Sequence, residues 1–289
     1  MLSVLIVNWN TREHLLACLR SLQDHPPKID HEVIVVDNAS TDASADAVKS
    51  QFPKMTLLEP GRNLGYAAGN NLAFQRAKGD YLLALNPDTE VFDQTLDLAV
   101  QRLQAYPHAG CLAARLLSPD GSTQRSVRGF PTPLGLFGDL TGLGKLFPNS
   151  SLGAYRMRAF DYDKEQPAPQ PMGTFLLFGS EALEEIQARE NPFDPAFPIF
   201  FNDVDLLFRL LQKQWTCVYS PQVRVLHHGG LSTRQVRKSM IWESHRSLIR
   251  YLSKHATGPL SRLGVSLLAP AVYAGAFIRA KGYDPGFRA

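Results

Sequence analysis

The sequence has few cysteines and little net charge, and each scarcity excludes a class of protein. Its three cysteines, Cys18, Cys111 and Cys217, are widely spaced in 289 residues. This spacing fits reduced thiols in a cytosolic protein and argues against a disulfide framework or a zinc cluster. The 30 basic and 27 acidic side chains give a formal net charge of +3. Such a balance does not indicate a general nucleic-acid binder.

The sequence also lacks signs of export and of repetition. Its N-terminus has no basic leader or small-residue cleavage site, and the apolar run at 2–7 ends at Asn8. Such a short run predicts a strand, so we expect a cytoplasmic chain that is not secreted. No internal repeat or low-complexity tract occurs, and 44% of the residues are hydrophobic. That share is enough for one large α/β domain, alone or with an appendage.

The common nucleotide-binding loops are absent. The sequence has neither a Walker loop nor a Gly-x-Gly-x-x-Gly fingerprint, which argues against ordinary ATP hydrolysis and dinucleotide hydride transfer. It has instead the segment GRNLGYAAGNN at 61–71. Its glycines allow close approach of the backbone, and its arginine and asparagines can contact a sugar or a phosphate.

Strand and helix patterns alternate along the chain and predict a mostly parallel sheet covered by helices on both faces. Thr11 is expected to cap the first helix. Irregular loops are expected over 118–171, which is rich in glycine, proline and basic residues. The expected strands are 2–7, 32–36, 55–58, 81–85, 111–116, 174–178 and 217–219, and the expected helices are 13–22, 44–52, 67–77, 95–106, one from 181 and one over 203–211.

Polar side chains follow several predicted strands. Asn8 and Trp9 follow the first strand, Asp37 the second, and Asn86 and Asp88 the fourth. Ligands of parallel sheets bind outside these carboxyl ends, where loops and helix N-termini converge. Asp37 could bind a nucleobase or ribose, and Asp88 could ligate a divalent cation on a nucleotide diphosphate. Taken alone, each carboxylate is better explained as part of a turn.

An acidic cluster lies late in the chain. Asp203 and Asp205 follow the aromatic run at 197–201, and apolar surroundings raise the pKa of a carboxylate toward the range of a general base. The same residues would stabilise the first turn of a helix, and the two roles are compatible.

A histidine pair follows the last predicted strand. His227 and His228 precede two glycines and Ser232-Thr233, a compact polar turn in which an imidazole could bind a metal or a leaving diphosphate. Two adjacent histidines without further context are more often ordinary surface residues.

The C-terminal tail is apolar over 263–278 and is flanked by Arg262, Arg279 and Lys281. This stretch is shorter than the ~20 residues that span a bilayer, and it contains Pro270, so a spanning helix is not expected. Two interpretations stay open: a helix that lies in the membrane interface and a helix that packs against the core.

The order of these motifs is more specific than any one of them. The chain resembles the family 2 inverting glycosyltransferases of the GT-A fold, particularly the bacterial rhamnosyltransferase-like branch. The matching segments are VLIVNWN at 4–10, VDNASTD at 36–42, RNLGYAAGNN at 62–71, LNPDT at 85–89, GTFLL at 173–177, FD at 193–194, DVDL at 203–206 and HHGG at 227–230.

The resemblance implies a role for each motif. Asp37 would contact the nucleotide base, Asp88 and His227 would hold Mg²⁺ or Mn²⁺ at the diphosphate, and Asp203 would be the catalytic base. Residues 1–117 would form a nucleotide-sugar-binding half and 118–235 an acceptor and catalytic half of one GT-A domain, with 236–289 as a helical tail. The donor site would also include Asn8, Trp9, Asn63, Gly65, Asn70 and Asn86, and the acceptor site Gly173, Thr174 and Asp205.

The chain departs from the family at one position. The acidic pair usually written Glu-Asp is Asn202-Asp203 here. The base-like carboxylate remains, but the loss of a neighbouring charge should make the pKa of Asp203 lower than in a paired site.

The implied reaction is transfer of a sugar from a nucleotide-sugar to an acceptor hydroxyl, with inversion. The first candidate donor is dTDP-rhamnose, followed by UDP-sugars. The acceptor would be a surface polysaccharide or a lipid-linked glycan precursor, met at the inner face of the membrane, and no nucleic acid is expected. Two alternatives remain: a sugar nucleotidyltransferase, and a degenerate sugar-nucleotide-binding protein in which Asn202 marks lost catalysis.

Overall fold

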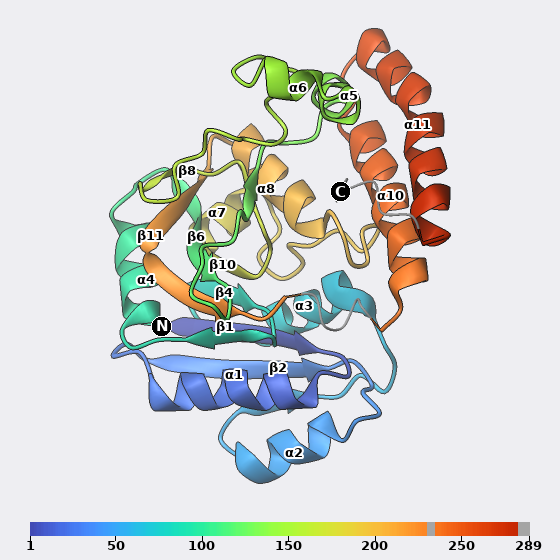
Figure 1. Ribbon diagram of the computed structural model, residues 1–289. Coiled ribbons are helices and arrows are strands. Elements are labelled where there is room, and N and C mark those ends of the chain that lie inside the picture. The colour runs from blue at the N-terminus through green and yellow to red at the C-terminus, as the bar shows by residue number, and fades with distance from the viewer. Residues whose placement is uncertain (230–234, 283–289) are drawn as a thin grey trace.

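The computed structural model describes residues 1–229 and 235–282. A central sheet is covered by helices on both faces, and a helical hairpin stands at one side (Figure 1). The strands are β1 (Leu2–Asn8), β2 (His31–Asp37), β3 (Thr56–Leu58), β4 (Tyr81–Leu85), β5 (Thr89–Val91), β6 (Ala109–Leu117), β7 (Val127–Arg128), β8 (Gln166–Pro167), β9 (Gln170–Pro171), β10 (Phe175–Gly179) and β11 (Thr216–His227). The helices are α1 (Arg12–Asp24), α2 (Ser44–Gln51), α3 (Gly65–Arg76), α4 (Thr95–Gln104), α5 (Pro133–Thr141), α6 (Leu143–Leu146), α7 (Ser180–Glu185), α8 (Asn202–Gln212), α10 (Arg237–Lys254) and α11 (Pro259–Ala280).

Within the described residues the main sheet has nine strands. Their order is β3-β2-β1-β4-β10-β6-β11-β5, and β8 pairs with β11. The pairs among β1 to β4 are parallel, as is β6 with β11, whereas β10 runs antiparallel to both of its neighbours. The predicted α/β class is therefore confirmed, with antiparallel strands in the second half of the sheet.

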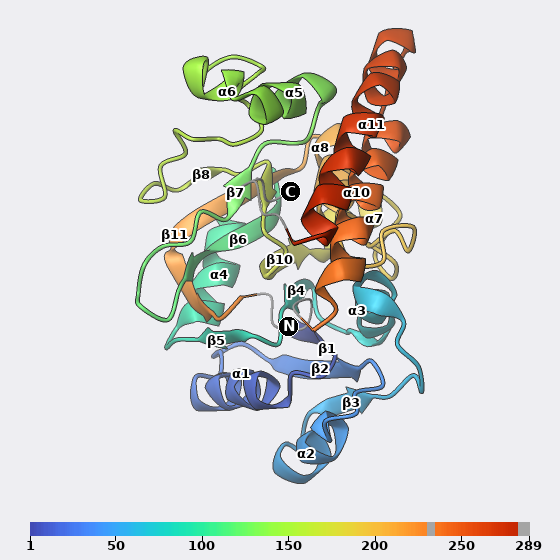
Figure 2. The ribbon, with the colours of Figure 1, turned by 45° about the vertical axis from the view of Figure 1, so that its right-hand side comes forward.

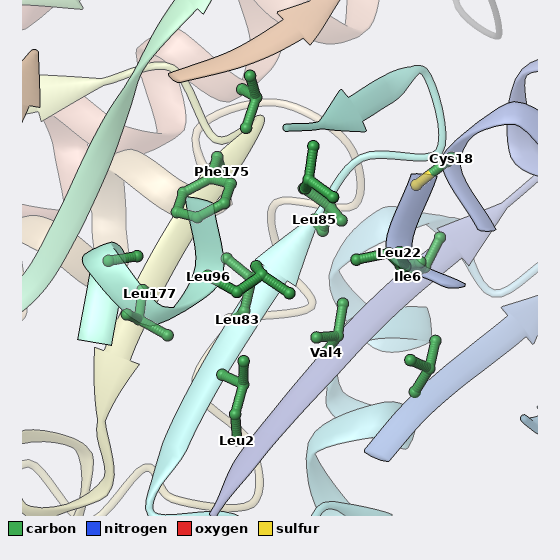
Figure 3. Close-up of a cluster of buried hydrophobic side chains, with 14 of the residues drawn as sticks. Leu2, Val4, Ile6, Cys18, Leu22, Leu83, Leu85, Leu96, Phe175 and Leu177 are labelled. Carbon is green, nitrogen blue, oxygen red and sulfur yellow. The ribbon is translucent and has the colours of Figure 1, made fainter. Parts of the chain in front are cut away.

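Alternate residues of the central strands point to opposite faces, which gives the sheet two cores. Leu2, Val4 and Ile6 of β1 pack with side chains of α1, α2 and α4 on one face (Figure 3). Leu5 and Val7 pack with α3, α7 and α8 on the other face. Burial on both faces explains why these strands are continuous apolar runs.

The segment 118–171 is more regular than predicted. It contains α5, α6 and three short strands, and Thr132 caps α5 by accepting a hydrogen bond from the N–H of Gly135 at 3.0 Å. Its glycines had indicated loops, but Gly138 is needed for packing, because a Cβ there would lie 2.3 Å from the carbonyl oxygen of Leu152. Most of this segment is irregular, as predicted, and the two helices and three short strands within it were not predicted.

The last strand of the sheet is longer than predicted. β11 runs from Thr216 to His227, well beyond the predicted 217–219, and its pairing with β6 shifts between Ser220 and Arg224. Pro221 lies in this irregularity, where a missing N–H interrupts the strand pattern without ending the strand. His227 is therefore the end of a strand, not part of a turn. Gly230, Ser232 and Thr233 of the predicted turn lie outside the described residues.

Thr11 does not cap α1 with its side chain, contrary to the prediction. Its hydroxyl donates to Oδ1 of Asn8 at 2.7 Å. The N–H of Arg12 instead donates to Oδ2 of Asp42 at 2.8 Å, from the loop after β2. The helix N-terminus is thus capped by a carboxylate from a neighbouring loop, and not by the threonine that the local sequence predicted.

The tail forms a helix of 22 residues, α11, that packs alongside α10 (Figures 1 and 2). Among the described residues it is the one helix whose length and composition would allow it to cross a membrane, and 22% of its most apolar stretch is buried. The argument that the tail is too short to span was therefore wrong, because the helix includes Pro259–Arg262 and continues through Pro270. One side of α11 packs against the core, because Val265, Leu268 and Val272 are buried in a cluster with residues of α10, and the rest of the helix is largely exposed. Packing against the core is therefore confirmed for one face, and contact with a membrane stays a prediction.

Candidate active site

A cavity of about 520 Å³ opens at the carboxyl ends of β1 and β4. The first residues of α3, α8 and α10 also border it. The structure brings most of the predicted site residues together here. Those that line the cavity are Asn8, Trp9, Asn63, Gly65, Asn86, Asp88, Gly173, Thr174, Asp203 and His227.

Asp37 and Asn70 lie behind the lining. Asp37 is buried, with Oδ1 accepting from Nδ2 of Asn8 at 2.9 Å and Oδ2 accepting from the N–H of Ser40 at 2.9 Å. It thereby ties the ends of β1 and β2 together. Asn70 donates to the carbonyl oxygen of Tyr66 at 2.9 Å within α3. Both residues support groups that face the cavity, whereas the sequence had assigned them direct contact with the donor.

Asp205 points away from the cavity, toward α10. Its carboxylate accepts from Arg209 at 2.9 Å, from Lys254 at 2.6 Å and from Nε2 of His255 at 2.8 Å. Burial raises the pKa of Asp205, but the hydrogen bonds from His255 and Lys254 and the charge of Arg209 outweigh it and bring the pKa to about 2. Its predicted place in the acceptor site therefore does not fit the structure, and its side chain fastens α8 to α10.

Asp203 stands at the beginning of α8 and faces the cavity. It lies so close to Gly173 that a Cβ on that glycine would be 2.7 Å from Oδ2. Burial raises the pKa of Asp203, and hydrogen bonds from the backbone N–H groups of Val204 and Gly173 offset part of this increase. The direction is the one that the aromatic run at 197–201 predicted. A carboxylate with a raised pKa is a better proton acceptor than an exposed one.

Asn202, the position at which the chain departs from the family that it resembles, is almost fully buried. Its Nδ2 donates to the carbonyl oxygens of Phe197 at 3.2 Å and Ile199 at 2.8 Å. A carboxylate has no proton to donate and would face two carbonyl oxygens here. The amide at this position therefore has a structural reason, because it holds the aromatic loop that borders Asp203.

Asp88 and His227 meet because β5 pairs with the end of β11. Thr89 lies opposite His227 in this antiparallel pair, and the N–H of His228 donates to the carbonyl oxygen of Asp88 at 3.0 Å. Oδ1 of Asp88 is then 3.7 Å from Nε2 of His227. Both atoms are buried and lack a hydrogen-bond partner among the described residues. Buried polar atoms without a hydrogen-bond partner are usually satisfied by a bound water or ion, and at this separation one such partner could contact both.

This pair fits a divalent cation. Nδ1 of His227 donates to Oε1 of Gln124 at 2.8 Å, which leaves the lone pair of Nε2 toward Asp88. Burial lowers the pKa of His227, and the charge of Asp88 counteracts only part of that change, so the imidazole is neutral as a ligand must be. Residues 1–229 and 235–282 contain no group of three or more His, Cys, Asp or Glu that could hold a metal. Oxygens of a substrate diphosphate and of water are the further ligands that a hard divalent cation would accept beside this pair.

Sequence reasoning missed two residues at the site. Gln124 also donates from Nε2 to the carbonyl oxygen of His227 at 2.8 Å, so it holds this histidine at two points. It lies in the segment taken as loops, and no motif marks it. The hydroxyl of Tyr66 lies 3.1 Å from Oδ1 of Asn86 and 3.2 Å from the carbonyl oxygen of Gly173. Tyr66 belongs to the glycine-rich segment, so its location there was the available signal.

Comparison with known proteins identifies the family of the chain. The sequence model described as "Glycosyl transferase family 2" matches residues 3–165, more than half of the chain. The chain belongs to this family. The glycosyltransferase is 29% identical over 273 residues to the N-acetylglucosaminyl-diphospho-decaprenol L-rhamnosyltransferase of Mycobacterium tuberculosis, covering 89% of this chain and 86% of the relative.

Solved structures show the same fold. The mannosyltransferase PcManGT from Pyrobaculum calidifontis, in complex with GDP-Man and Mn²⁺, aligns with a TM-score of 0.59 at 18% identity, covering 96% of this glycosyltransferase and 69% of that chain. A TarS structure from S. aureus in complex with UDP aligns with a TM-score of 0.55 at 15% identity, covering 98% and 72%. The GT-A fold expected from the motifs is thereby confirmed.

Proposed function

We propose that this glycosyltransferase transfers a sugar, with inversion, from a nucleotide-sugar to a hydroxyl of a lipid-linked glycan precursor. The first candidate donor is dTDP-rhamnose, because the relative that aligns over most of both chains is named as a rhamnosyltransferase of N-acetylglucosaminyl-diphospho-decaprenol. The observation that carries the proposal is one cavity that contains Asp203 together with the facing pair Asp88 and His227. UDP-sugars are the next candidates.

Asp203 is the proposed catalytic base. As the acceptor oxygen attacks the anomeric carbon, Asp203 accepts the hydroxyl proton, and the bond between that carbon and the diphosphate oxygen breaks on the opposite face of the sugar. The raised pKa of Asp203 supports this role. Gly173 and Thr174 border the proposed acceptor side, and the absence of a side chain at Gly173 leaves room for the carboxylate.

Asp88 and His227 are the proposed ligands of Mg²⁺ or Mn²⁺. The cation, when bound, would neutralise the negative charge of the leaving diphosphate. Asp88 supplies an oxygen ligand and His227 a neutral nitrogen, and Gln124 keeps the imidazole oriented. The proposed donor-binding residues are Asn8, Trp9, Asn63, Gly65 and Asn86, supported from behind by Asp37 and Asn70.

We retain residues 1–235 as the proposed transferase domain and 236–289 as a helical tail that contacts the inner face of the membrane. Two observations bear on this division. Val236, Ser239 and Met240 at the beginning of the tail line the cavity, so the tail contributes to the site. The apolar helix α11 is mostly exposed, which would suit contact with a bilayer that carries a lipid-linked acceptor.

The first test is thermal unfolding of the full chain with dTDP, UDP or GDP, each with and without Mn²⁺. Ligand that binds the folded state raises its apparent stability, so one nucleotide should raise Tm only when Mn²⁺ is present. Transfer is then measured with the corresponding donor and an N-acetylglucosaminyl-diphospho-lipid. No Tm shift with any nucleotide would overturn the donor-site assignment.

The same assays separate the two alternatives. Release of pyrophosphate from a nucleoside triphosphate would support a nucleotidyltransferase. A donor that binds but is not consumed with any acceptor would support a degenerate binding protein. The structural role of Asn202 argues against the second alternative, because its amide is explained by two carbonyl partners and need not mark lost catalysis.

A further inference from the structure

A group of large apolar side chains is exposed at the end of the molecule that α5, α6 and α11 form. Figures 1 and 2 show these helices together, at the end opposite α2. The side chains are between 44% and 86% exposed. We call this group the α5–α6–α11 surface; it consists of Leu134, Phe137, Leu140, Leu146, Phe147, Leu260, Leu263 and Leu267.

The arrangement of α11 accounts for its unusual composition. Val265, Leu268 and Val272 are buried in one cluster with residues of α10. At about 100° per residue, Leu263 and Leu267 lie on the opposite side of the helix. One apolar stripe therefore holds α11 on α10, and a second apolar stripe faces outward. A soluble surface helix would have polar residues on that second face.

α5 continues the outward stripe of α11. The two helices are neighbours, and a Cβ on Gly264 would lie 3.2 Å from Cβ of Pro133. Leu134, Phe137 and Leu140 recur at three-residue spacing along α5 and are all exposed. The apolar side chains of the two helices therefore belong to one patch, larger than the isolated exposed apolar residues of ordinary protein surfaces.

Two basic residues lie on the helices that form this patch: Lys145 in α6 and Arg262 in the first turn of α11. α11 contains no acidic residue. The acidic residue of α5, Asp139, has a side chain only 6% exposed, and it pairs with Arg156 at 2.8 Å. An apolar patch with cations at its border is complementary to a bilayer that has anionic headgroups.

We infer that the α5–α6–α11 surface docks the protein on anionic bilayers, with its apolar side chains in the acyl boundary. This inference deepens the proposed function, which places the acceptor in the same bilayer. α11 lies on the membrane and does not span it, because its other face is already buried against α10. The helix is about 33 Å long and packs along α10, whose N-cap residue Val236 and nearby Met240 line the cavity. The docking surface and part of the cavity wall thus belong to one helical hairpin.

The test is flotation of the full chain with vesicles that contain neither donor nor acceptor. Vesicles of phosphatidylcholine are compared with vesicles in which ~30% of the lipid is phosphatidylglycerol. We expect at least tenfold tighter partition onto the anionic vesicles. Phe137→Ser/Leu140→Ser in α5 and Leu263→Ser/Leu267→Ser in α11 should each weaken that partition at least tenfold. Lys145→Glu/Arg262→Glu should remove the preference for anionic lipid.

The matched control is Phe92→Ser/Tyr106→Ser, which changes exposed aromatic residues on other elements and should leave partition unchanged. Folding of each variant is checked by Tm and by its Mn²⁺-dependent nucleotide shift. The inference is overturned if the wild type binds neither vesicle, if the α5 variant partitions like the wild type, or if the α5 and α11 variants only abolish self-association. Transfer to a water-soluble acceptor tests the proposed function separately, since these variants should retain it.

Discussion

The two sides of the cavity are held in different ways. Asp88 and His227 are positioned by the pairing of β5 with β11, and His227 is also held by two neutral hydrogen bonds with Gln124. Asp203 is positioned by α8, and α8 is fastened to α10 through the buried carboxylate of Asp205. The side of the proposed metal ligands (the metal side) thus depends on strand register, whereas the side of the proposed base (the base side) depends on charge.

The two sides should therefore lose function under different conditions. Strand pairing and the hydrogen bonds with Gln124 involve no charge, so the positions of Asp88 and His227 should depend on particular side chains more than on pH. Acid should affect this side by protonating the two proposed ligands themselves, which releases a bound cation. The base side contains two carboxylates with opposite pKa shifts, raised at Asp203 and lowered at Asp205. Acid should therefore remove the base first and weaken the fastening of α8 at lower pH.

Asp203→Asn gives the largest expected effect. The amide cannot accept the acceptor proton, so kcat should fall by ~10²- to 10⁴-fold. Mn²⁺-dependent nucleotide binding should be unchanged, because strand pairing holds Asp88 and His227 in place independently of Asp203. Steady-state transfer and the nucleotide Tm shift are measured on the same preparation. A folded variant with wild-type kcat would remove Asp203 from the mechanism.

Asp205→Asn should reduce stability without removing nucleotide binding. The pKa of Asp205 in the folded protein is about 2, below the ordinary value of 3.8 for an aspartate. A lowered pKa stabilises the fold at pH above the unfolded value, so this contribution is about 2 kcal/mol at pH 7 and is lost as the pH falls from about 4 to about 2. Denaturant unfolding is measured for both proteins between pH 7 and pH 2. If the difference in unfolding free energy between the two proteins does not narrow on acidification, the charge of Asp205 does not hold α8 on α10.

Gln124→Ala should weaken the metal side alone. The variant frees Nδ1 of His227 and removes the bond to the histidine carbonyl, so Mn²⁺ affinity in the presence of nucleotide diphosphate should fall by ~10- to 100-fold. Gln124→Glu keeps an acceptor for Nδ1–H and should recover part of the affinity. At saturating Mn²⁺, the pH at which the transfer rate declines on acidification should be the same in the variant and in the wild type. Equal affinities for Ala and wild type would show that strand pairing is sufficient.

The first half of the fold was predictable because its patterns are local. Runs such as 2–7 and 81–85 are apolar throughout, as strands buried on both faces require, and they match β1 and β4 closely. β5 was missed because three residues give no periodic signal, and its pairing with β11 joins positions far apart in sequence. α5 was missed because the glycines that let it pack against Leu152 also resemble loop residues.

The site was predictable where a residue faces the cavity from a strand end or a helix start. Asp88, Asp203 and His227 all line it. Asp205 was misassigned because sequence spacing does not tell which side of the first turn of α8 faces α10. Gln124 was missed because its importance comes from a bond to a histidine 103 residues away. Supporting residues of this kind are determined by tertiary contacts, which no local pattern records.

Asn202→Asp should give the smallest effect, a shift in the pH at which Asp203 becomes protonated and kcat/KM declines. Asp203 must be ionised to act, and burial raises its pKa, so kcat/KM should decline on acidification at a pH above 3.8. A second carboxylate beside it disfavours ionisation, so in the variant the decline should move to higher pH by about one unit. The variant also loses two donated hydrogen bonds and should be less stable by roughly 1–3 kcal/mol. The pH profile is therefore recorded well below its Tm, with Gln124→Ala at saturating Mn²⁺ as the control. An acid limb that does not move would mean that the group titrating in the profile is not Asp203.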